Sequence, residues 1–166
     1  ANHFDLDLYG LDVSNAFARA DITEEELYVK QPTGYEQLDS ETNKPFICKL
    51  NKGLYGTKQA ARLWNKKFSH FLISRGWRQY ESDTCLYSRY TKRFGHELIG
   101  LYVYDIVHAC KTNKAHSDLL RACNSQFPTT SQGALDWILG IHIKRNRPTR
   151  TISLDQNQAI SDFLAT

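Results

Sequence analysis

Residues 98–111, LIGLYVYDIVHACK, constrain the fold of this chain more than any other segment. They predict two short apolar strands, 98–103 and 106–109, joined by a tight turn at Tyr104 and Asp105. Aspartate is a common turn residue, whereas a bulky aromatic residue is a poor one. A tyrosine beside an acid at the end of a hairpin therefore indicates a turn that has a function, or had one in an ancestor.

The length and charge of the chain limit the classes of protein to consider. The 166 residues predict one domain, which is long enough to bury a proper core. The net charge of +3 allows a phosphate-rich partner without requiring one. No apolar run is long enough to span a membrane and no signal peptide opens the chain, so we expect an intracellular protein, cytoplasmic or nuclear. The chain begins with Ala1 rather than Met, which favours a piece of a longer polypeptide.

The cysteines and histidines give no indication of a structural metal site. The four cysteines are far apart and form no CxxC pair, and the six histidines show no paired spacing. We therefore expect reduced thiols and no zinc site at Cys48, Cys85, Cys110 and Cys123.

Short strands and helices alternate along the rest of the chain. Hydrophobic periodicity and turn residues predict strands at 4–13, 27–30, 46–50, 84–90, 137–144 and 151–154, and helices at 60–75, 114–126 and from 156 onward. Thr112 or Asn113 can cap the second helix. The frequent hairpins predict an α+β fold, in which helices pack on one face of a mainly antiparallel sheet.

Asp12 is the first residue that could carry chemistry. It closes the first expected strand in the segment LDVSNAF, where an acid is most often an ordinary cap or turn residue. Its importance rises if that strand lies beside the hairpin, because two acids at strand ends could then share metal ions. Phosphoryl transfer by two ions about 4 Å apart requires carboxylates that bridge both, and magnesium prefers hard oxygen ligands.

Two further segments could contact a ligand. In residues 50–64, LNKGLYGTKQAARLW, glycines precede a helix whose start would favour phosphate, while Lys52, Lys58 and Arg62 add positive charge. The alternative is a tight turn with solvated lysines. In residues 137–145, WILGIHIKR, a glycine inside a strand indicates either close approach by another backbone or an ordinary bulge.

Taken in this order, the segments resemble the reverse transcriptase of Ty1/copia-type retrotransposons. The matching runs are LDVSNAF, EEELYVKQPTGY, LNKGLYGTKQAARLW, ESDTCLY, LYVYDI and LGIHI, which together cover essentially the whole chain. The LYGxKQ and SDxCLY elements followed by the hairpin are specific to that family. The hairpin corresponds to the family's YVDD box, written here as residues 102–105.

The resemblance implies roles for individual residues. Asp12 would be the acid that binds both magnesium ions, and Asp105 would be the second acid of the hairpin pair. Phe17 would lie beneath the incoming sugar and favour deoxynucleotides. The nucleotide and template would be bordered by Tyr55, Gly56, Lys58 and Gln59, and the primer grip would contain Leu139, Gly140 and Ile141. The implied partners are an RNA template, a DNA primer and deoxynucleoside triphosphates, with two Mg²⁺ ions as cofactors.

Tyr104 departs from the family pattern, because it occupies the position of the first aspartate of the YVDD box. A neutral phenol with a pKa near 10 is no magnesium ligand at neutral pH, and its ring is too large for the space of a carboxylate and a hydrated ion. Asp105 should point to the other face of the strand, so it could replace that acid only after a shift of the turn. Losing one oxyanion donor costs an enzyme about 10²–10³ in rate, and losing a bridging ligand should cost at least as much. The sequence therefore predicts a domain that is inactive or nearly so in polymerisation.

The resemblance also implies a single palm domain over residues 1–166, with partial fingers at about 22–57 and without thumb or RNase H. Such a piece would contact nucleic acid weakly and in a salt-sensitive way. Three interpretations stay open: a decayed copy, a non-catalytic nucleic-acid- or protein-binding module retained by a host, and an active fragment that tolerates Tyr104. A coherent basic or apolar patch away from the cleft of Asp12 and Asp105 would favour the second. The candidate patch, otherwise a solvated helix face, contains Arg62, Lys66, Lys67, Arg75 and Arg78.

Overall fold

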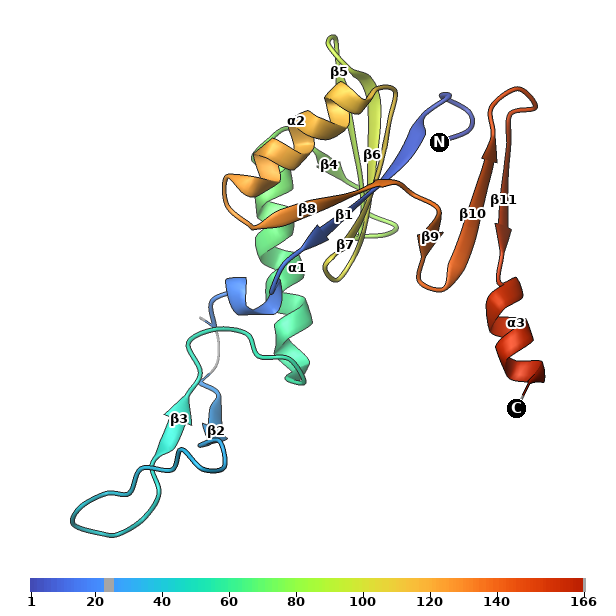
Figure 1. Cartoon of the computed structure of the whole chain (residues 1–166). Coiled ribbons are helices and arrows are strands. Elements are labelled where there is room, and N and C mark those ends of the chain that lie inside the picture. Colours follow the sequence, from blue (N-terminus) through green and yellow to red (C-terminus); the bar gives the residue numbers. More distant parts are fainter. Residues whose placement is uncertain (23–25, 166) are drawn as a thin grey trace. The chain divides into compact units, whose positions relative to one another are not determined.

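The computed structural model describes residues 1–22 and 26–165 (Figure 1). The first two glutamates of the EEELYVKQPTGY segment and the last residue of the expected C-terminal helix lie outside the described residues. The chain divides into two compact units. The sheet unit contains Ala1–Ser14 and Leu72–Thr166, and the inserted unit contains Asn15–Phe71.

A six-stranded antiparallel sheet forms the centre of the sheet unit (Figure 1). Its order is β4-β5-β6-β7-β1-β8, so the first strand of the chain lies between the hairpin strand β7 and the edge strand β8. The bounds are β1 Asp7–Val13, β4 Arg78–Gln79, β5 Leu86–Thr91, β6 Gly95–Tyr102, β7 Asp105–Cys110 and β8 Thr129–Ala134.

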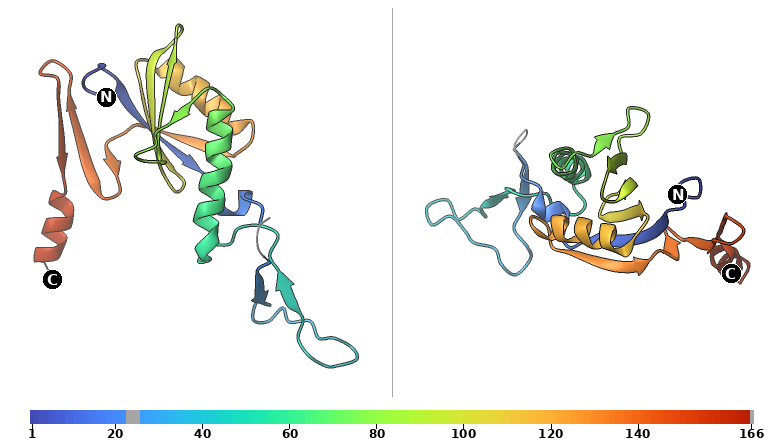
Figure 2. Two further views of the ribbon diagram at one scale, coloured as in Figure 1. Left: turned by 180° about the vertical axis from the view of Figure 1, so that it is seen from behind. Right: turned by 90° about the horizontal axis from the view of Figure 1, so that it is seen from above.

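One helix covers this sheet on the side of its buried core. Helix α2, Asn113–Asn124, contacts β7 and β8 (Figures 1 and 2), and the side chain of Thr112 caps it by accepting a hydrogen bond from the N–H of Ala115. Leu119 and Cys123 of α2 are fully buried. The expected α+β class with a mainly antiparallel sheet is confirmed, and Thr112 rather than Asn113 is the cap.

A second, three-stranded sheet follows within the same unit. It consists of β9 Trp137–Ile138, β10 Ile141–Asn146 and β11 Thr151–Asp155, and helix α3, Asn157–Leu164, comes after it. The prediction of one continuous strand over residues 137–144 is wrong, because the chain reverses at Leu139 and Gly140 and β9 pairs antiparallel with β10. The strands β4 and β8 were not predicted from the sequence.

The inserted unit is built around the aromatic face of helix α1, Lys58–Ile73. Trp64, Phe68 and Phe71 are buried. The ring centroid of Phe68 lies 5.3 Å from that of Trp64 and 5.5 Å from that of Phe71. A short 3₁₀ turn, Phe17–Arg19, and a two-stranded sheet of β2, Tyr28–Lys30, and β3, Ile47–Lys49, complete the unit.

Asp21 ties together two segments of the inserted unit. Its carboxylate accepts hydrogen bonds from Lys52 at 2.6 Å and from Lys67 at 2.9 Å, and these bonds lower the pKa of Asp21 to about 2. Lys67 also donates to the carbonyl of Arg19.

None of the helices that the structure describes is long and apolar enough to cross a membrane.

Candidate functional site

The β6–β7 hairpin turns at Val103 and Tyr104, one residue earlier than the sequence predicted. Tyr102 closes β6 and pairs with Asp105, which opens β7, so Asp105 belongs to the strand and not to the turn. Val103 adopts a left-handed conformation with φ +56°, which is rare for a β-branched residue. Residues held in such conformations concentrate at functional sites, where the surrounding structure compensates for their cost.

Asp105 and Asp12 lie directly opposite each other on β7 and β1. Opposed residues of an antiparallel pair point to the same face, with their Cβ atoms about 4.5–5.5 Å apart. Burial raises the pKa of Asp105, and the charge of Asp12 raises it further. The two acids thus meet as expected, on a hairpin whose turn lies one residue earlier than the sequence predicted.

The acid pair belongs to a row of polar side chains that crosses four strands. The register aligns Tyr102 with Asp105, Asp105 with Asp12, and Asp12 with Thr130. Tyr102 and Thr130 are exposed, and the two acids are partly exposed. The next residues along the three inner strands, which point to the opposite face, are the buried Leu101, Ile106 and Leu11. The sheet therefore presents an oxygen-rich row on its open face and buries the other face.

Tyr104 lies in the turn itself, next to this row. Its carbonyl accepts a hydrogen bond from the N–H of Val13 at 3.1 Å, which fastens the turn to the end of β1. The side chain of Tyr104 is partly exposed. The turn position beside the two acids is therefore occupied by a neutral phenol on a backbone that is anchored to the strand carrying Asp12.

The row of polar side chains contains two carboxylates, those of Asp12 and Asp105. Within residues 1–22 and 26–165, no three His, Cys, Asp or Glu side chains lie close enough together to hold a metal ion. Asp12 and Asp105 supply carboxylate oxygens of the kind that magnesium binds.

The residues expected in the primer grip form the turn of the β9–β10 hairpin. Leu139 and Gly140 have φ values of +51° and +74°, which identifies a two-residue type I′ turn, and Ile141 pairs with Ile138. The glycine thus marks neither a bulge nor a close backbone approach. Leu139 and Gly140 line a pocket of about 160 Å³ together with Asp105, so the structure brings this turn and one of the acids together.

The residues expected around the nucleotide lie in the inserted unit. Phe17 and Tyr55 are in contact, with ring centroids 4.6 Å apart. Gly56 has φ +88°, and Lys58 and Gln59 open helix α1. Gly53 has no room for a side chain, because an added Cβ would lie 2.6 Å from the carbonyl oxygen of Phe17.

Two of the basic residues proposed as a patch, Lys67 and Arg75, take part in the packing of their own units. Lys67 binds Asp21 and the Arg19 carbonyl, and Arg75 donates to the hydroxyl of Ser125 at 3.2 Å. These contacts make Lys67 and Arg75 parts of the folded framework of their own units.

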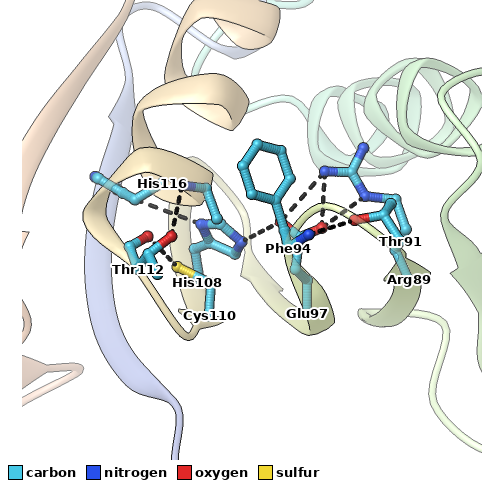
Figure 3. A network of polar contacts seen from close by, with 9 residues as sticks. Arg89, Thr91, Phe94, Glu97, His108, Cys110, Thr112 and His116 are labelled. Carbon is cyan, nitrogen blue, oxygen red and sulfur yellow. Dashed lines mark hydrogen bonds and ion pairs between the residues drawn. The ribbon is translucent and has the colours of Figure 1, made fainter.

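A buried polar network that no sequence pattern predicted crosses the core of the sheet unit (Figure 3). Glu97 of β6 is fully buried and accepts two hydrogen bonds from Arg89, its cross-strand partner on β5, at 3.0 and 3.2 Å. The guanidinium of Arg89 lies 4.5 Å from the ring centroid of Trp77. His108 of β7 approaches Glu97 on the other side, with 3.4 Å between Nε2 and Oε2.

The network continues from β7 to the helix and the edge strand. The Nδ1 atoms of His108 and His116 are 3.5 Å apart, and Nε2 of His116 lies 2.8 Å from the hydroxyl of Ser131. Burial lowers the pKa of both histidines, that of His116 to about 4. The same strands that carry Asp105 and Thr130 are therefore linked through the core by neutral imidazoles.

Comparison with known proteins gives one consistent result. The family model described as reverse transcriptase (RNA-dependent DNA polymerase) matches residues 2–165. The chain is 35% identical over 164 residues to the retrovirus-related Pol polyprotein from transposon TNT 1-94 of Nicotiana tabacum, which covers 99% of this chain and 12% of that protein. It is 32% identical over 157 residues to the retrovirus-related Pol polyprotein from transposon RE1 of Arabidopsis thaliana, and this alignment covers 93% of this chain and 10% of that protein. A putative transposon Ty5-1 protein of Saccharomyces cerevisiae is 31% identical over 136 residues, which cover 82% of this chain and 42% of that protein. The chain thus spans about a tenth of the length of the two plant polyproteins.

Proposed function

Because the chain belongs to the reverse transcriptase family, with Ty1/copia-type Pol polyproteins among its relatives, we propose that it forms the palm and part of the fingers of an RNA-directed DNA polymerase. The sheet unit would be the palm, and residues at about 22–57 would be the partial fingers. The partners would be an RNA template, a DNA primer and deoxynucleoside triphosphates. Support for the assignment comes from the match over nearly the whole chain.

In this proposal each part of the site has a separate task. Asp12 and Asp105 would hold Mg²⁺, which, when bound, neutralises phosphate charge and activates the primer hydroxyl. Phe17 would exclude a sugar with a 2′-hydroxyl. Tyr55, Gly56, Lys58 and Gln59 would border the nucleotide and template, and Leu139, Gly140 and Ile141 would support the primer end.

We further propose that catalysis is impaired, and one observation carries this inference. Asp12 and Asp105 face each other, while the turn residue next to them is Tyr104, which offers no anionic ligand. Two carboxylates could hold one ion, but catalysis assisted by two ions would lack one of its shared ligands. The expected loss is about 10²-fold or more in rate, by analogy with the loss of one transition-state ligand.

Primer extension on an RNA template tests the proposal. The chain should be assayed within a longer reverse transcriptase of the family, beside an Asp12→Asn variant and an enzyme with two aspartates in the corresponding turn. We expect extension no higher than that of Asp12→Asn. Extension well above that control would contradict the impairment. Retention of the template–primer without extension would agree with a non-catalytic nucleic-acid-binding module of the same fold.

A further inference from the structure

We propose that the indole of Trp137 is a stacking platform for the terminal, unpaired nucleobase of a nucleic-acid strand, held beside Asp105. The inference rests on the proposed function for the class of ligand, but its geometry is independent of whether the chain still polymerises. It concerns a residue outside the expected primer-grip segment.

Trp137 differs from the other two tryptophans in its exposure. Its exposed fraction is 48%, whereas Trp64 and Trp77 are 0% and 3% exposed. Trp137 is therefore the tryptophan whose ring is accessible from solvent, and every nucleobase offers a flat face that can stack on such a ring.

The ring of Trp137 is held rigidly from one side. His142, its cross-strand partner, stacks on it with centroids 4.5 Å apart and planes inclined by 11°. Nδ1 of His142 lies 3.4 Å from the Asp155 carboxylate, which also approaches Lys144 at 3.3 Å. The two-residue turn at Leu139 and Gly140 fixes the hairpin itself. One face of the indole is thus supported, and the remaining exposed surface is preorganised for a planar ligand.

The platform opens on the acid site. Trp137 lines the pocket of about 160 Å³ together with Asp105 and Gln132. The amide of Gln132 offers both a donor and an acceptor to the edge of a base. A base stacked on Trp137 would therefore bring the end of its strand next to the carboxylate of Asp105. Ile106, Ile138 and Leu139 also line the pocket, which therefore offers apolar contact to the face of a base and polar groups to its edge.

Intrinsic fluorescence provides a selective measurement, because the two other tryptophans are buried. The 166-residue chain should be titrated with a 12-residue oligothymidylate, and separately with a 12-residue oligouridylate, at low salt. We expect saturable quenching that disappears in Trp137→Phe. Fluorescence anisotropy of labelled oligonucleotides should show an affinity about tenfold lower for Trp137→Ala and close to the unmodified chain for Trp137→Phe.

Tyr90→Ala is the matched control. Tyr90 is 65% exposed and its ring also contacts a histidine, His96, at 4.9 Å, but it lines neither the acid row nor this pocket. Its loss should leave oligonucleotide affinity unchanged, and urea midpoints should show that all variants fold. Binding without Trp137 quenching, an unchanged affinity in Trp137→Ala, or no binding by either readout would overturn the proposal. The proposal that catalysis is impaired is tested by primer extension, whereas the proposal for Trp137 is tested by binding alone. The two proposals can therefore fail independently of each other.

Discussion

Asp12 and Asp105 are cross-strand partners at the end of the sheet where the hairpin turns, and the charge of Asp12 raises the pKa of Asp105. Like charges placed opposite each other destabilise an antiparallel pair. Such an arrangement is understandable where a cation or a reacting group once compensated for it. The pair is thus a feature of the site rather than of the framework.

Replacing one of these acids should stabilise the fold. We expect Asp12→Asn to raise the free energy of unfolding at pH 7 by about 0.2–1 kcal/mol, because it removes the repulsion from Asp105. Urea denaturation gives the measurement. The gain should shrink at about pH 3, because the raised pKa of Asp105 favours its protonated form there and a neutral carboxyl repels no charge. Asp5→Asn serves as the contrasting variant and should lower stability, since Asp5 lies 2.8 Å from Arg145. A loss of stability in Asp12→Asn at pH 7 would contradict the repulsive pair.

The buried pair of Arg89 and Glu97 should be essential for the sheet unit. Glu97→Ala would leave the guanidinium of Arg89 in the core without its carboxylate, which typically costs about 3–5 kcal/mol. Chemical denaturation should therefore show a large loss. Arg121→Ala is the comparison, because Arg121 is 80% exposed and 3.7 Å from Asp118, and it should change stability by less than about 1 kcal/mol. Similar effects of the two substitutions would argue against a structural network in the core.

Stability should also depend on pH through His116. Burial, and to a lesser degree His108, lowers the pKa of His116 from 6.5 to about 4. Between about pH 6.5 and 4 the imidazole of His116 is protonated in the unfolded chain but neutral in the folded chain. The contribution of His116 to the free energy of unfolding is therefore fully present above pH 6.5 and is lost as the pH falls toward 4. Between about pH 7.5 and 5 we expect a loss of about 2 kcal/mol from this group. The loss should be smaller in His116→Gln. An equal pH dependence in that variant would assign the effect to other groups.

Elements with a regular apolar pattern could be predicted from the sequence. The two hairpin strands and helix α2 were placed within a few residues, because their buried sides repeat at the expected spacing. The edge strand β8, TTSQGA, has no such pattern, since most of its side chains are exposed. Its place is set by pairing with β1, which local sequence does not encode.

The predicted positions of the two hairpin turns were wrong for the same physical reason. Val103 and Leu139 both adopt positive φ, which residue type does not suggest, so the first turn was placed one residue late and the second was overlooked. The polar network was missed because its members lie far apart in the chain. Only the strand register and the packing of α2 bring together Arg89, Glu97, His108, His116 and Ser131. The meeting of Asp12 with Asp105, by contrast, followed from the motif order.

The most direct test of the account is the reversal of its key substitution. Extension of a DNA primer on an RNA template should be compared between the unmodified chain and Tyr104→Asp, both within the same longer reverse transcriptase. We predict that Tyr104→Asp raises the rate by about 10²-fold or more, because it restores the third carboxylate beside Asp12 and Asp105. Equal rates of extension, with robust activity in the unmodified chain, would contradict the claim that Tyr104 closes the site.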